Sequence, residues 1–109
     1  MNHVKVSIYI NEADKWQHRP LHVELLSMLD KNDIAGGTVL RAIAGFTRGG
    51  PVVTTSLVDL GSKLPLVVEF IDTAEKVDAV LPKVQEMAGI RLIIRESVEV
   101  VTGSYPDSY

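Results

Sequence analysis

The chain has 109 residues, of which 46% are hydrophobic and 23% charged, and its formal net charge at pH 7 is −3. This length fits one domain spanning residues 1–109, and the dispersed charge excludes a nucleic-acid-binding surface, because neutralising phosphates requires clustered Lys and Arg. The lack of cysteine excludes disulfides, thiol nucleophiles and cysteine-bound zinc.

No stretch of the chain reaches the roughly 18 apolar residues of a membrane-spanning helix. The N-terminal residues enter a strand pattern directly and lack the layout of a signal peptide. We therefore expect a cytoplasmic protein.

The first half of the chain begins with a strand and a helix. Apolar residues at every second position from Val4 to Ile10 predict the first strand. A polar loop over residues 11–19 follows, and Pro20 suits the first turn of a helix. Apolar residues at helical spacing from Leu21 predict a core-facing helix that ends at residues 32–35. Gly36-Gly37 then stops this helix, since glycine readily adopts the left-handed conformation that follows a helix C-terminus.

A β-branched segment between Gly37 and Gly45 predicts the second strand, and a glycine-rich loop leaves its end. This loop shows neither helix nor strand periodicity, and it carries Arg48. A flexible cationic loop at the end of a strand is suited to binding an anion or a partner protein. Residues 52–60 carry mixed signals, so this segment is either an extended arm or part of a hairpin.

The second half predicts a third strand over residues 64–71 and a second helix. Asp72 and Glu75 form a capping-box pattern at the start of that helix. An apolar stripe at helical spacing then continues to Ala88, with Pro82 inside it. Because proline removes one backbone hydrogen bond, we expect the helix to be kinked or split there, and we expect it to end at Gly89.

A last strand is expected from residue 90 to residue 100, bent near residue 96, and residues 102–109 have the composition of a loose polar tail. The element order is therefore βαββαβ. This order predicts a ferredoxin-like α+β fold, in which two helices cover one face of an antiparallel four-stranded sheet.

The sheet face without helices is expected to mix apolar and charged side chains. A monomer that left this surface in water would be unusual, whereas a homo-oligomer that packs sheet against sheet buries it. Strand alternation assigns to this face the side chains of Lys5, Tyr9, Val39, Arg41, Ile43, Val67, Glu69, Ile71, Ile93, Arg95, Glu99 and Val101. Among them, the subunit interface is expected to include Tyr9, Arg41, Ile43, Glu69, Ile93 and Arg95.

Several stretches in one order along the chain carry a resemblance to a known family. They are Asp14-Lys15-Trp16, Arg19-Pro20-Leu21, the run from Ala35 to Phe46, the run from Thr55 to Leu60, the run from Leu64 to Asp72, and Leu81-Pro82. With these motifs, the chain resembles an uncharacterised bacterial family of PII-like proteins, relatives of the nitrogen regulatory PII signal transducers. The resemblance extends over residues 4–101.

The resemblance implies a ferredoxin-like homotrimer with a mobile loop at residues 45–55, which changes shape with ligand and contacts a target protein such as a membrane transporter or channel. It also implies adenine-nucleotide binding in clefts between subunits. By position, the ligand-binding residues are Gly45, Phe46, Thr47, Arg48, Gly49, Gly50, Gly89 and Arg91. The loop lacks the tyrosine that PII proteins modify, so uridylylation is not implied, and Ala42 and Thr47 stand where related sequences often have glycine.

Two arginines are weighed as ligand contacts. Arg48 offers a guanidinium group beside flexible glycines, which suits a phosphate or carboxylate, and the alternative is a solvated hairpin loop. Arg91 follows Gly89 at the start of a strand, where an exposed edge charge is the alternative to a contact with the loop of a neighbouring subunit.

Trp16, with Lys15 and Arg19, is interpreted as a packing anchor for the adjacent helix rather than as a nucleotide platform. His18 and His22 are four residues apart, but Pro20 places His18 before the helix, so no metal site is expected.

The leading hypothesis is a non-enzymatic sensor that binds a small anionic metabolite and has no cofactor or metal. The alternative is a metal-tolerance or structural trimer of the same fold without a nucleotide ligand. A small enzyme ranks last, because the sequence has no nucleophile elbow, Walker lysine loop or dinucleotide fingerprint.

Overall fold

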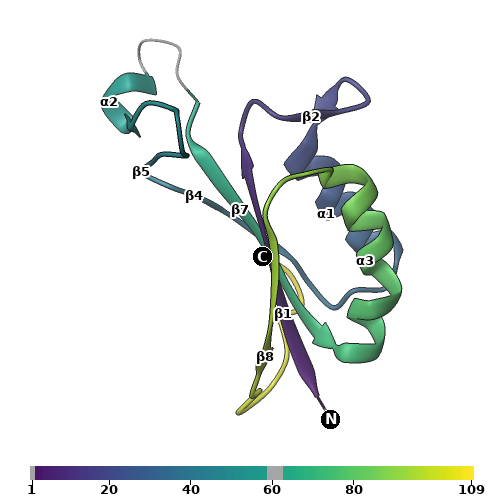
Figure 1. The fold of residues 1–109 in the computed structure, drawn as a ribbon. Helices are drawn as coiled ribbons and strands as arrows, with labels where there is room; N and C mark the ends of the chain where they lie inside the picture. The colour runs from purple at the N-terminus through teal and green to yellow at the C-terminus, as the bar shows by residue number, and fades with distance from the viewer. Residues whose placement is uncertain (1, 59–62) are drawn as a thin grey trace.

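The computed structural model describes residues 2–58 and 63–109. An antiparallel sheet in the order β4-β7-β1-β8 has two helices packed on one face (Figure 1), which confirms the predicted ferredoxin-like α+β fold. The strands of this sheet are β1 (His3–Asn11), β4 (Thr38–Arg41), β7 (Pro65–Thr73) and β8 (Ile93–Val98), and the two helices are α1 (Leu21–Lys31) and α3 (Ala74–Ala88). None of the helices in the described ranges is long and apolar enough to cross a bilayer.

The segment predicted as a loop before α1 forms a small hairpin of β2 (Lys15–Trp16) and β3 (Arg19–Pro20). Gln17 and His18 make its two-residue turn with φ angles of 50° and 71°. Two consecutive positive φ angles match the twist of a hairpin, although glycine or asparagine usually supplies them. Pro20 lies in β3 and directly precedes α1, so its predicted place in the first helical turn is wrong.

Helix α1 ends at Lys31, earlier than the glycine pair that was expected to stop it. Asn32 follows the helix and its Nδ2 donates to the carbonyl of Met28 at 2.7 Å. Asp33 then adopts a φ of 63°, so an aspartate and not a glycine takes the left-handed position. Asp and Asn tolerate this conformation because their short polar side chains bond locally.

The second predicted strand is interrupted. Strand β4 ends at Arg41, and β5 (Ala44–Gly45) leaves the sheet to pair with β6 (Val53–Thr54), which makes an outlying hairpin. Figure 1 shows this hairpin beyond the start of β7, with the short helix α2 (Thr55–Val58) after it. Of the two readings of residues 52–60, the hairpin is confirmed for Val53–Thr54, and residues 59 and 60 lie outside the described ranges.

Helix α3 is continuous through Pro82 and ends at Gly89, whose φ is 62°. Its N-cap is Thr73, whose Oγ1 accepts from the Lys76 N–H at 3.3 Å, so the capping role predicted for Asp72 is wrong. The buried Asp72 carboxylate instead accepts from the N–H groups of Ala35 and Thr73 at 2.9 and 2.7 Å. It therefore links the chain after α1 to the end of β7.

The core lies between the helices and the covered face of the sheet. Alternate residues of β1 and β7 point into it, as the sequence predicted, and the buried helix positions meet them from the other side. Fully or nearly fully buried members include Val6, Ile8, Leu21, Leu25, Val68, Phe70, Val77 and Val84.

Strand register corrects several predicted side-chain directions. Arg41 pairs with Leu66, Ile93 with Ile8 and Arg95 with Val6, and these partners belong to the core or its edge. The side chains of Val39, Arg41, Ile93 and Arg95 therefore lie on the helix-covered side, not on the face without helices. Consecutive apolar residues such as Ile93-Ile94 allow either phase of alternation, so the sequence pattern does not select the face.

We call the other side of the sheet the open face. It carries Lys5, Ser7 and Tyr9 of β1, Val67, Glu69 and Ile71 of β7, Thr38 and Leu40 of β4, and Ile94 and Glu96 of β8. Lys5 and Glu69 form an ion pair there, with Nζ and Oε2 3.3 Å apart. Ile43 lies outside the strands and is exposed, and Glu99 and Val101 follow the end of β8.

Residues 102–109 form neither helix nor strand, but the tail contacts the sheet at two points. The Tyr105 hydroxyl accepts from the Ile71 N–H at 3.1 Å, and the Tyr109 hydroxyl lies 3.1 Å from Thr38 Oγ1. The Tyr105 ring packs on Gly36, where a Cβ atom would lie 2.6 Å from the ring. Gly36 is therefore required for close approach of the tail, a role that differs from the predicted helix stop.

Candidate functional site

A cleft of about 600 Å³ lies beside the β5–β6 hairpin. The hairpin base lines one side with Gly45, Phe46 and Thr47, and the end of β1 and the start of β7 line another. Arg91, in the connection between α3 and β8, completes the lining. Segments that are far apart in the sequence thus meet in one concave surface within a single chain.

Of the eight predicted ligand-binding residues, five line this cleft: Gly45, Phe46, Thr47, Gly50 and Arg91. Arg48, Gly49 and Gly89 do not. Gly49 and Gly89 have φ angles of 82° and 62°, which are turn conformations that favour glycine. Gly45 has a packing role, because a Cβ atom there would lie 2.8 Å from Cγ of Pro65. It lets the hairpin rest directly on the start of β7.

Arg91 is held in the cleft by two hydrogen bonds. Its Nε donates to Asp14 Oδ2 at 2.8 Å, and its Nη1 donates to the carbonyl of Ala88 at 2.9 Å. The same Asp14 oxygen accepts from the Asn11 N–H at 2.8 Å. Asp14 also lines the cleft, so a carboxylate stands beside the cation that was predicted to receive an anion.

Sequence reasoning missed Asp14 and Lys63 as residues of this site. Asp14 lies 77 positions before Arg91, so no local spacing signals the ion pair. Lys63 reaches the cleft from the segment before β7. The sequence marked Asp14 as part of a motif shared with PII-like proteins and as one charge in a polar loop, and neither feature places it beside Arg91.

A second ion pair lies outside the cleft lining and joins segments that contribute to it. The Arg41 guanidinium makes a fork with Glu12, with Nε to Oε2 at 3.1 Å and Nη2 to Oε1 at 3.2 Å. Glu12 Oε1 also accepts from the Leu64 N–H at 2.9 Å. The turn after β1 is thereby attached to the end of β4 and the start of β7. Arg41, which was expected at a subunit interface, therefore has an ion-pair partner within its own chain.

The Asp14 and Glu12 carboxylates are expected to make the stability of the fold depend on pH in the acid range. Hydrogen bonding to Arg91 lowers the pKa of Asp14, and hydrogen bonding to the Leu64 N–H and to Arg41 lowers the pKa of Glu12. The unfolded chain therefore binds more protons in acid. The stabilisation that the two lowered pKa values give the folded protein is complete above the unfolded pKa values of about 3.9 and 4.3. It is lost as the pH falls through the lower pKa values of the folded state.

We therefore expect Asp14→Asn to reduce the free energy of unfolding more at pH 7 than at pH 3, because pH 3 lies below the unfolded pKa of about 3.9, where the stabilisation from the lowered native pKa is already partly lost. Urea unfolding at the two pH values measures this difference. An equal loss at both pH values would show that the charge of Asp14 does not stabilise the fold.

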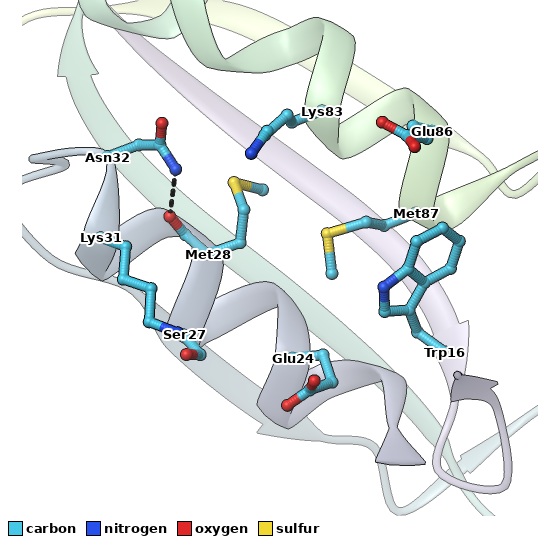
Figure 2. A pocket seen from close by; sticks show the side chains of 9 residues that line it. All are labelled: Trp16, Glu24, Ser27, Met28, Lys31, Asn32, Lys83, Glu86 and Met87. Carbon is cyan, nitrogen blue, oxygen red and sulfur yellow. Dashed lines mark hydrogen bonds between the residues drawn. The ribbon is translucent and has the colours of Figure 1, made fainter. Parts of the chain in front are cut away.

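A separate groove of about 310 Å³ runs between α1 and α3. Figure 2 shows the side chains of Met28 and Met87 between the two helices, with the Trp16 indole beside Met87. Trp16 packs against the core, which confirms its interpretation as a packing anchor. Lys15 and Arg19 do not line this groove. Its apolar floor and solvated charged rim are consistent with helix packing.

Within residues 2–58 and 63–109, no group of three or more His, Cys, Asp or Glu side chains has the arrangement of a metal site. His18 sits in the β2–β3 turn and His22 lies on α1, so the two belong to different elements.

Comparison with known proteins places these features in a family. Residues 3–100 match the model of DUF190, described as Uncharacterized ACR, COG1993. A UPF0166 protein of Aquifex aeolicus (strain VF5) is 34% identical over 94 residues, which cover 86% of this chain and 89% of that protein. The UPF0166 protein MJ1524 of Methanocaldococcus jannaschii is 30% identical over 82 residues, which cover 75% of each chain. The match extends from β1 to beyond β8, and this chain belongs to the DUF190 family.

Proposed function

We propose that this protein is a non-enzymatic, PII-like sensor that binds a small anionic metabolite beside the β5–β6 hairpin, with an adenine nucleotide as the first candidate. One observation carries the proposal: the cleft joins the base of the 45–55 segment to Arg91 and Lys63. A ligand-responsive protein needs a contact for the ligand and a segment that moves when the ligand binds. In this proposal the cations of the cleft provide the contact, and the 45–55 segment is the part that moves.

The lining of the cleft suits a ligand with an apolar body and an anionic group. Tyr9, Phe46, Val53 and Val67 provide aromatic and aliphatic surface, and the Arg91 guanidinium keeps Nη2 for a further hydrogen bond.

Two exposed apolar surfaces support the partners in this proposal. On the open face, Tyr9, Leu40 and Ile94 are 44%, 50% and 39% exposed, and packing of sheets in a homotrimer would cover them. Around the hairpin, Ile43, Phe46 and Val52 are exposed at 79%, 72% and 61%, which suits contact with a target protein. The target class that we favour is a membrane transporter or channel, by resemblance to PII proteins.

Arg91→Ala tests the ligand site directly. We expect it to weaken binding of an adenine nucleotide by roughly tenfold to a hundredfold, the effect of losing one charge-assisted hydrogen bond. Titration calorimetry with ATP, ADP, AMP and cyclic AMP measures the native affinity first.

Arg48→Ala is the matched control, because the same substitution is made in the neighbouring loop outside the cleft lining. It is expected to change the affinity less than Arg91→Ala does. Absence of heat with all four nucleotides would remove the nucleotide proposal, and equal losses in the two variants would move the site out of the cleft.

A further inference from the structure

The net positive charge of the cleft lining is smaller than Arg91 and Lys63 together would give. Among the described residues, its charged lining side chains are Asp14, Lys63 and Arg91, two cations and one carboxylate with a net charge of +1. The sequence predicted a cationic binding loop, but Arg48 is absent from the lining. A ligand in the cleft therefore meets a nearly balanced set of charges.

The Asp14 carboxylate is a fixed part of this set. Its oxygen bonds both Arg91 Nε and the Asn11 N–H, each at 2.8 Å. Its own N–H donates to the carbonyl of Asn11 at 2.9 Å, and its carbonyl accepts from the Leu21 N–H at 2.9 Å. These backbone bonds attach residue 14 to the end of β1 and the start of α1. A bound anion therefore approaches Arg91 with Asp14 still beside it.

The electrostatic consequence depends on the charge of the ligand. Attraction to Arg91 and Lys63 and repulsion from Asp14 both grow in proportion to that charge. A ligand with one negative charge matches the net charge of the lining. The attraction of a lining with a net charge of +1 grows only in proportion to the ligand charge, whereas the cost of removing that charge from water grows with its square. A polyphosphate therefore loses more hydration than three side chains replace, and Asp14, whose side chain is 23% exposed, adds repulsion.

We propose that Asp14 makes this cleft selective for a ligand with an apolar or aromatic body and a single negative charge, such as a phosphodiester or a carboxylate, over polyphosphates. This inference rests on the proposed function and specifies the ligand class of the same site. Asp14 is a specificity-determining residue that acts through its charge and its bond to Arg91.

The test compares four ligands with the same adenosine body and increasing negative charge: cyclic AMP, AMP, ADP and ATP. Calorimetry is performed with EDTA, so that no divalent cation neutralises the phosphates. For the native protein we expect affinity to decrease from cyclic AMP to ATP. For Asp14→Asn, which keeps an acceptor oxygen for Asn11, we expect a gain of roughly threefold for cyclic AMP that rises to tenfold or more for ATP.

Two further variants serve as controls. Asp78→Asn removes a different Asp–Arg ion pair, between Asp78 Oδ1 and Arg95 Nη1 at 2.6 Å, outside the cleft lining. It is expected to leave all four affinities unchanged. Asp14→Glu retains the negative charge and is expected to retain the native order of ligands, which separates an effect of charge from a loss of local structure.

The outcomes distinguish this inference from the proposed function. If the native protein binds nucleotides but prefers ATP, or if Asp14→Asn changes all four affinities by the same factor, the inference is wrong and the sensor proposal stands. If neither the native protein nor Asp14→Asn binds any of the four ligands, the nucleotide site itself is wrong and the inference is overturned with it.

Discussion

Phe70→Ala is expected to lower the free energy of unfolding by about 3–5 kcal/mol. Phe70 lies in the middle of β7, is 0% exposed and belongs to the core between the sheet and the helices. Truncating it removes buried apolar surface and leaves a cavity that the close-packed neighbours fill only in part. A domain of this size has a total stability on the order of 5–15 kcal/mol, so the loss is a large share of it. Urea unfolding followed by circular dichroism measures the change.

The chain offers a matched control, because Phe46 is its one other phenylalanine. Phe46 lies after β5 and is 72% exposed, so Phe46→Ala is expected to change stability by no more than about 0.5 kcal/mol. Similar losses in the two variants would contradict the assignment of the core. Because Phe46→Ala is expected to stay folded, its nucleotide affinity can also be measured by titration.

The covered half of the fold was most predictable in β1, which alternates clearly. There Lys5, Ser7 and Tyr9 separate the apolar core residues, so the core face follows from the pattern, whereas in β7 only Glu69 and Asp72 interrupt the apolar run. Val39-Leu40 and Ile93-Ile94 lack such separation. Their strands also pair on one side only, and the register came from contacts with β7 and β1 that the sequence does not display.

The local turns were less predictable than the strands. Gln17 and His18 carry positive φ angles in the β2–β3 hairpin, and neither residue type signals such a turn. Thr73 caps α3 because β7 continues two residues beyond the predicted strand end, which displaces Asp72 from the cap. A shift of one residue at an element boundary is enough to exchange the roles of neighbouring polar side chains.

The candidate site was predicted in outline and not in its charge. The glycines around residue 45 and the resemblance to PII-like proteins indicated the hairpin base and Arg91, which the structure brings into one cleft. The pairing of Arg91 with Asp14 depends on how the chain after β1 meets the connection after α3. Only the tertiary structure contains that information, and it is the basis for proposing a weakly charged ligand instead of a polyphosphate.

Ile94→Glu is expected to dissociate the proposed trimer. Ile94 lies on β8, on the open face, and is 39% exposed in the single chain. If sheets pack against each other, the new carboxylate is buried without a partner and beside Glu96 of the same strand face. An unpaired buried charge is costly, and we expect the dissociation constant to rise by roughly a hundredfold or more. Light scattering of the native protein should give about three times the chain mass of 11.9 kDa, and the variant should approach the single-chain mass.

Ile90→Glu makes the same chemical change at a fully exposed residue between α3 and β8, outside the sheet, and is expected to leave the mass of the assembly unchanged. A native mass of 11.9 kDa would remove the homotrimer, and a trimer that survives Ile94→Glu would place the interface elsewhere. The cleft beside the hairpin is formed within one chain, so nucleotide binding by a dissociated Ile94→Glu variant remains measurable. Comparing its affinity with that of the native trimer determines how much of the ligand site a neighbouring subunit supplies.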